Sequence, residues 1–193
     1  MNFLDLLRQF MPQILSFLQG QSKQIMEKPV PAAPVQVHID LPSPAQDPSV
    51  SIDWNNPKCP ITQHFTVEDA CMLHSWNRLA NESDGLDDQM KAKLVILCKK
   101  MEEIRAFLGC SMNVHCIFRS QQYNKEVVKA NPNDPHSRGM AIDFDANQTM
   151  TIDELHAKLE PVLEQYGLRM ERNTPTWCHL DTCPVVHARY FLP

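Results

Sequence analysis

The sequence predicts an α+β domain with a small, mostly antiparallel sheet packed against helices, preceded by an amphipathic helix and a proline-rich linker. Short β-type segments alternate with helical ones and are joined by short returns, which favours this fold class. Seven of the fifteen prolines lie between Pro29 and Pro57, a stretch too poor in apolar residues to form a core. We therefore expect a docking helix at residues 1–20, a linker at 21–57 and a folded domain at 58–193.

Apolar side chains in the first 20 residues recur at intervals of three and four, the pattern of an amphipathic helix. Asp5, Arg8 and Pro12 interrupt the apolar run, and no small-residue cleavage site follows it. The segment therefore lacks the features of a signal peptide or a membrane span. We expect the protein to be made in the cytoplasm and this helix to dock on a protein assembly or a membrane surface.

Composition excludes two classes of function. The 193 residues carry a net charge of −5 and contain no run of Lys or Arg. This argues against a nucleic-acid-binding protein. The seven cysteines form no CxxC pair, which argues against a disulfide framework and against a cysteine-rich zinc module.

Capping signals and periodicity predict the elements of the folded domain. Thr66 caps a helix that we expect to continue to about Leu79. An apolar stripe from Asp88 to Leu108 predicts a long helix that ends at Gly109. The other expected elements are helices at 120–130 and 152–166 and strands at 112–118, 140–144, 168–171, 177–181 and 188–192.

Three side chains form a candidate metal site. In the strand at 140–144, alternation places Asp143 on the face opposite to the apolar side chains. A carboxylate among apolar neighbours must be paired or bind a metal. His136 precedes this strand in a turn, and His179 lies in the strand at 177–181. Two imidazoles and a carboxylate suit Zn²⁺, with a fourth position left for water as in catalytic sites.

The segments around these residues resemble a known family. Residues 136–143 read HSRGMAID, which fits HxxGxAxD, and residues 177–179 read WCH, which fits WxH. The pair of motifs is similar to that of the zinc D-alanyl-D-alanine carboxypeptidase and endopeptidase family, which includes phage endolysins and shares its fold with Hedgehog signalling domains. The resemblance covers the chain from Cys59 onward. It implies a zinc peptidase that cuts peptidoglycan peptides at the cell wall, either after release from the cell or as a component of a phage particle.

The resemblance also implies substrate-binding residues. The family has an arginine in a YRS-like sequence followed by YN, and here FRSQQYN supplies Arg119 and Tyr123. Arg119 would bind the substrate carboxylate or carbonyl, and His115 on the preceding strand would help to stabilise the oxyanion. Where the family often has a serine, this chain has Asp134, which would orient His136.

The catalytic base is the point at which the chain departs from the family. The family's acid/base lies a few residues before WxH, and the nearest such place holds Thr176, which cannot accept a proton. Glu171 is the closest acid upstream and our first candidate; Asp181 is the second. The departure leaves open an alternative, a non-catalytic zinc-binding protein that retains the peptidase fold.

Overall fold

The computed structural model describes residues 51–192. The chain divides between Ala45 and Gln46 into two units, and the second of these contains all of the described residues. The predicted N-terminal helix and most of the predicted linker lie outside the described residues. Ile52 and Trp54, which the sequence assigns to the linker, pack against the core of the domain. The folded part therefore begins before residue 58.

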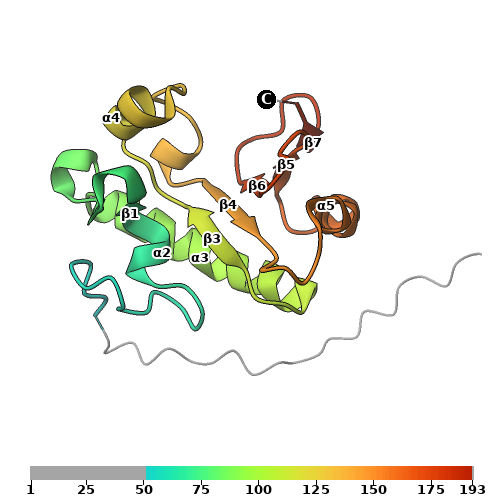
Figure 1. The fold of residues 1–193 in the computed structure, drawn as a ribbon, viewed down its shortest axis with the longest axis horizontal. Coiled ribbons are helices and arrows are strands. Elements are labelled where there is room, and N and C mark those ends of the chain that lie inside the picture. The colour runs from blue at the N-terminus through green and yellow to red at the C-terminus, as the bar shows by residue number, and fades with distance from the viewer. Residues whose placement is uncertain (1–50, 193) are drawn as a thin grey trace, which may run out of the picture. The chain divides into compact units, whose positions relative to one another are not determined.

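The fold is α+β and is built on a five-stranded sheet with the order β3-β4-β6-β5-β7 (Figure 1). Its strands are β3 (Asn113–Cys116), β4 (Ala141–Asp145), β5 (Arg169–Glu171), β6 (Cys178–Asp181) and β7 (Tyr190–Phe191). Neighbouring strands are antiparallel except for β5 and β7, which are parallel. A second sheet pairs β1 (Met72–Leu73) with β2 (Arg78–Leu79). The prediction of small, mostly antiparallel sheets is confirmed.

The helices precede or separate these strands in the chain. They are α2 (Val67–Cys71), α3 (Asp88–Leu108), α4 (Gln121–Tyr123) and α5 (Ile152–Leu159). Shorter helical turns are η1 (His74–Trp76), η2 (Glu82–Asp84), η3 (Asn124–Val128), η4 (His136–Arg138) and η5 (Glu160–Val162). Within residues 51–192, no helix is both long and apolar enough to cross a membrane.

Helix α3 has the boundaries and the buried stripe that the sequence predicts. The side chain of Asp87 accepts a hydrogen bond from the Met90 backbone N–H at the start, and Gly109 adopts φ 71° at the end. Its buried side chains are Leu94, Leu97, Cys98, Met101, Ile104 and Leu108. Strong local signals at both ends and one apolar face explain why the sequence sufficed here.

The helix predicted to run to Leu79 is wrong beyond Cys71. Its capping box forms as predicted, but the backbone becomes extended at Met72, with φ −70° and ψ 121°. The following segment is held by tertiary contacts, since the Ser75 backbone N–H donates to the Tyr123 hydroxyl at 3.0 Å. Packing against a distant segment therefore overrides the local helical pattern.

Two further predicted helices are shorter or irregular. The segment 152–166 is α-helical only through Leu159 and continues as a 3₁₀ turn that contains Pro161. Proline lacks the N–H that an α-helix would use there. The segment 120–130 contains the three-residue α4 and the π-helical η3.

The two faces of the sheet have different environments. Apolar residues of β4 and β6 pair across the strands and belong to the core that includes α3 and α5: Ile142 with Leu180, and Phe144 with Cys178. Helix α5 packs beside β6 (Figure 1). The alternate residues Ala141, Asp143, His179 and Asp181 lie on the opposite face, which we call the site face. The predicted alternation in both strands is confirmed.

Gly139 lies where the turn that carries His136 packs against helix α3. It adopts φ +67°, and a Cβ added there would lie 2.6 Å from the Met90 sulfur. Gly167 has nearly the same φ of +65°, but an added Cβ would meet nothing within 4 Å. A residue with a side chain would therefore be equally strained by the backbone at both positions, but only at Gly139 would its Cβ also meet a neighbouring side chain.

We expect Gly139→Ala to lower the free energy of unfolding more than Gly167→Ala, for which the loss is only that of a left-handed residue, about 1–2 kcal/mol. The extra loss at Gly139 comes from displacement of Met90 and of the turn, so metal affinity at His136 should fall as well. Urea denaturation and metal titration of both variants measure these effects. Equal losses in the two variants would contradict the close contact with α3.

Candidate metal centre

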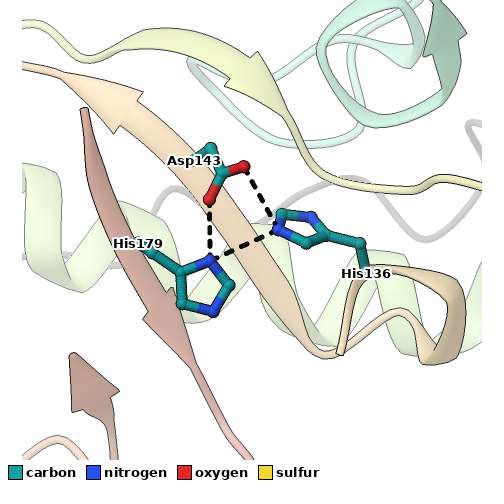
Figure 2. Close-up of side chains that lie close together, drawn as sticks. All are labelled: His136, Asp143 and His179. Carbon is teal, nitrogen blue, oxygen red and sulfur yellow. Dashed lines mark hydrogen bonds and ion pairs between the residues drawn. The ribbon is translucent and has the colours of Figure 1, made fainter. Parts of the chain in front are cut away.

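Three side chains from separate segments meet on the site face (Figure 2). Asp143 comes from β4, His179 from β6 and His136 from η4, and one ligand atom of each lies within 4.8 Å of the others. His136 Nε2 is 3.3 Å from His179 Nδ1. The Asp143 oxygens lie 2.7 Å from His179 Nδ1 and 3.2 Å from His136 Nε2. Together these three residues could hold a metal ion, as the sequence predicts.

The ring orientation of His136 is fixed by the backbone. Its Nδ1–H donates to the Ile117 carbonyl oxygen at 2.9 Å, so Nε2 is the ring nitrogen that faces Asp143. The His136 side chain is only 1% exposed. The prediction that Asp134 orients His136 is wrong. Asp134 instead accepts hydrogen bonds from Arg119 and from the Ser137 backbone.

His179 is held from the side opposite to Asp143. Its Nε2 lies 3.6 Å from an Asp181 oxygen, while Nδ1 faces Asp143. Arg169 donates to both Asp181 oxygens at 2.8 and 2.9 Å, and the Cys183 backbone N–H donates to Asp181 at 2.8 Å. A carboxylate behind a histidine ligand fixes the ring and makes its free nitrogen a better ligand.

Charge is distributed so that the carboxylates stay ionised in this buried site. Burial would raise the pKa of Asp143, but His136 and His179 hold it well below its usual range. Burial would lower the pKa of His179, but the hydrogen bond to Asp143 and the contact with Asp181 raise it to about 9. Burial likewise opposes ionisation of Asp181, and His179 and Arg169 lower its pKa.

The two candidate bases occupy different surroundings. Asp181 is fully buried, and both of its oxygens are engaged with Arg169. Glu171 is half-buried at the end of β5, one residue beyond the last residue of that strand that pairs with β6. Because Arg169 reaches Asp181 on the site face, alternation places Glu171 on the same face. Among residues 51–192, no side chain forms a hydrogen bond or an ion pair with the Glu171 carboxylate.

The three residues predicted to bind substrate make different contacts. Arg119 follows β3, with one nitrogen 3.0 Å from Asp134 and a buried Nε without a partner. Tyr123 is buried, and its ring lies edge-on to Trp76 at 5.1 Å. His115 lies on Asp145, with its Nε2 2.7 Å from a carboxylate oxygen.

Sequence reasoning missed Arg169, Asp145 and Cys116. Arg169 could be found only from the register of β5 with β6, which no local pattern gives. Asp145 is two residues beyond Asp143, so alternation alone places it on the site face. Cys116 pairs with Asp143 across the sheet. Burial raises the pKa of its thiol to about 12, so it stays protonated and is a poor ligand.

Comparisons with known proteins give no further assignment. The chain matches no known protein family, no curated protein and no solved structure. A function for this chain therefore has to be inferred from its motifs and from the geometry of the described residues.

We expect Asp181→Asn to weaken metal binding about 10- to 100-fold, the usual effect of losing a carboxylate behind a histidine ligand. Asp84→Asn is the matched control, because Asp84 forms a similar bidentate pair with Arg78 at 2.6 and 3.0 Å outside the metal centre. Competition with a chelator measures both affinities. If the two variants lost the same affinity, the effect would be one of stability rather than of His179 orientation.

Metal affinity should rise with pH. In the metal-free protein His179, with a pKa of about 9, carries a proton at neutral pH that metal binding must release. The affinity should increase by up to about tenfold per pH unit and level off near that pKa. Calorimetry in buffers of different ionisation enthalpy counts the released protons. About one released proton per bound ion is expected. A metal affinity that does not change between pH 6 and pH 9 would contradict this prediction.

In the metal-free protein, the ionisation of His179 and that of Asp143 should change the free energy of unfolding with pH in opposite directions. The raised pKa of His179 stabilises the fold below about pH 6.5, and this contribution is lost as pH rises through about 9. The lowered pKa of Asp143 stabilises the fold above about pH 3.9 and is lost as the pH falls. Denaturation of the chelator-treated protein across pH measures both limbs.

Proposed function

We propose that the chain is a zinc metallopeptidase that hydrolyses an amide bond in bacterial peptidoglycan stem peptides or cross-links. The observation that carries this proposal is the convergence of two oriented imidazole nitrogens and one ionised carboxylate on the site face. Two further groups are available: the Glu171 carboxylate, which alternation places on the same face of the sheet, and the buried Nε of Arg119, which has no hydrogen-bond partner. These are the parts that amide hydrolysis requires.

The donor set and its spacing favour zinc. A tetrahedral ion with bonds of about 2.0–2.1 Å separates its ligand atoms by about 3.3 Å. His136 Nε2 and His179 Nδ1 are 3.3 Å apart. Asp143 supplies an oxygen to both, which completes a three-ligand set of the kind that leaves a fourth position open. Zinc held there would lower the pKa of a water molecule toward about 7 and polarise a carbonyl group.

Glu171 is the group that takes and returns the proton. Its carboxylate lies on the face of the metal ligands and is not committed to another side chain within the described domain. It accepts the proton from the attacking water and delivers it to the leaving amine. Asp181 does not fit this role, because its two oxygens already accept from Arg169 and the Cys183 backbone.

Arg119 binds the charged or polar end of the substrate. Its side chain is 16% exposed, its guanidinium forms one ion pair with Asp134, and its buried Nε has no partner. A planar guanidinium has five N–H donors, so a substrate carboxylate or carbonyl can be added to the Asp134 contact. In this role Asp134 sets the position of Arg119.

The substrate class and the Hedgehog-type fold rest on the resemblance of HSRGMAID and WCH to the D-alanyl-D-alanine peptidase family. The site of action, the bacterial cell wall, and a role as a phage lytic or virion-associated enzyme belong to the same proposal. So does docking through residues 1–20.

The proposal is tested with zinc-loaded protein and purified peptidoglycan peptides. We expect Glu171→Gln to lower kcat about 10²- to 10⁴-fold, as for loss of a general base, while zinc content stays at that of the wild type. Glu164→Gln, which changes an exposed glutamate outside the sheet, is the control and should retain full activity. Release of amino groups and zinc content are both measured.

The outcomes separate the two functions that the sequence left open. Wild type that holds zinc stoichiometrically but releases no amines from any stem peptide would be a non-catalytic zinc-binding protein. Active wild type with an equally active Glu171→Gln variant would retain the peptidase and remove Glu171 as its base. Activity on plain L-peptides but not on stem peptides would retain the chemistry and reject the cell-wall substrate.

A further inference from the structure

A second polar cluster lies beside the metal centre on the site face. It consists of Asn113 and His115 from β3 and Asp145 from the end of β4. One Asp145 oxygen accepts from Asn113 Nδ2 at 2.8 Å and lies 2.7 Å from His115 Nε2. The other accepts from the Asn147 backbone N–H at 2.6 Å. No step of the proposed hydrolysis uses this cluster.

Alternation in β3 places His115 on the site face, because it lies two residues beyond Asn113, which pairs with Asp145. The strand is irregular at this point. Val114 pairs with Phe144, but the next pair joins Cys116 to Asp143, so His115 is an extra residue in the strand. The bulge therefore brings Cys116 opposite Asp143, where His115 would otherwise pair, while the His115 ring contacts Asp145.

The hydrogen bonds fix the tautomer of His115. The Asp145 carboxylate accepts in its contacts with Asn113 and Asn147, and a carboxylate has no proton to give. The hydrogen of a neutral His115 ring is therefore on Nε2, and Nδ1 is left as an acceptor. The His115 side chain is 39% exposed, and no residue of the described part of the chain forms a hydrogen bond with its Nδ1.

We propose that His115, oriented by Asp145, is a substrate-recognition residue whose Nδ1 accepts a hydrogen bond from a peptide N–H about two residues from the cleaved bond. Asp145 follows Asp143 by two residues, or about 7 Å along the strand. An extended substrate spans about 3.3–3.6 Å per residue, so an amide at the metal centre brings its second neighbour over His115. This inference rests on the proposed peptidase function and names the side of the site that reads the peptide backbone.

Two substitutions at His115 test the roles of its two ring nitrogens separately. The Asn side chain can place an acceptor near the position of Nδ1, whereas Gln places its amide near that of Nε2 and keeps a donor for Asp145. We expect His115→Gln to raise KM about 3- to 10-fold, the worth of one neutral hydrogen bond, with kcat and zinc content unchanged. His115→Asn should recover part of the loss, and Asp145→Asn should resemble His115→Gln.

His64→Gln is the matched control. His64 forms a similar pair with Glu102, with Nδ1 2.7 Å from a carboxylate oxygen, in a part of the domain outside the site face. This variant should leave KM unchanged. A rise in KM for His64→Gln as large as that for His115→Gln would overturn the proposal, because it would point to a general effect on folding.

The substrate side of the contact is tested with synthetic stem pentapeptides in which one backbone N–H at a time is replaced by an ester oxygen. Wild type should lose about 3- to 10-fold in KM with one ester, the one that lacks the donor for Nδ1, and His115→Gln should lose nothing further with it. Independent losses at every position would overturn the proposal.

A spectroscopic measurement distinguishes failure of this inference from failure of the proposed function. ¹⁵N chemical shifts of the imidazole in zinc-loaded protein report the tautomer, and we expect the Nε2–H form with Nδ1 shifting when a stem pentapeptide is added. An Nδ1–H form, or an unchanged Nδ1 at saturating peptide, would overturn the inference. Absence of hydrolysis together with the expected Nδ1 shift would reject the peptidase and retain His115 as a peptide-binding residue.

Discussion

The pairing of β4 with β6 is the constraint on which the candidate site depends. It aligns Asp143 with His179 on one face and Ile142 with Leu180 on the other. A slip of one residue would move the apolar pair to the site face and bury the two ligands in the core. The free energy of burying Ile142 and Leu180 therefore selects the register that assembles the metal ligands. The strand register that packs the core is therefore also the register that brings the metal ligands together.

The ionised groups on the site face are ordered so that each buried charge has a neighbour of opposite sign. Arg169 pairs with Asp181, Asp181 lies against His179, and His179 contacts Asp143. Removing any member leaves an uncompensated charge, which is more destabilising than the loss of the pair itself. A metal ion at the three ligands would replace the proton on His179 as the positive charge facing Asp143. Without an ion, positive and negative groups still alternate along this row.

Local signals were sufficient wherever one segment determines its own structure. The caps and stripe of α3, the alternation of β4 and the turn at His136 were all predicted from the sequence. The prediction of a helix to Leu79 failed because a distant segment decides there. The Tyr123 hydroxyl accepts from the Ser75 backbone N–H and holds the segment that the sequence predicts as helix. The HxxGxAxD spacing identified His136 and Asp143, but only the β5–β6 register reveals that Arg169 engages Asp181.

The difference between the two candidate bases follows from that register. Both Asp181 and Glu171 lie on the site face, so their position in the sheet does not decide which of them is the better candidate for the base. Their hydrogen-bond partners decide it. A carboxylate whose oxygens accept from a bidentate arginine and a backbone N–H is stabilised in its charged form and is a weak base. Asp181 therefore suits a fixed negative charge that orients a ligand. Glu171 has no such partners among the described residues, and for this reason the proposed hydrolysis assigns the role of base to Glu171.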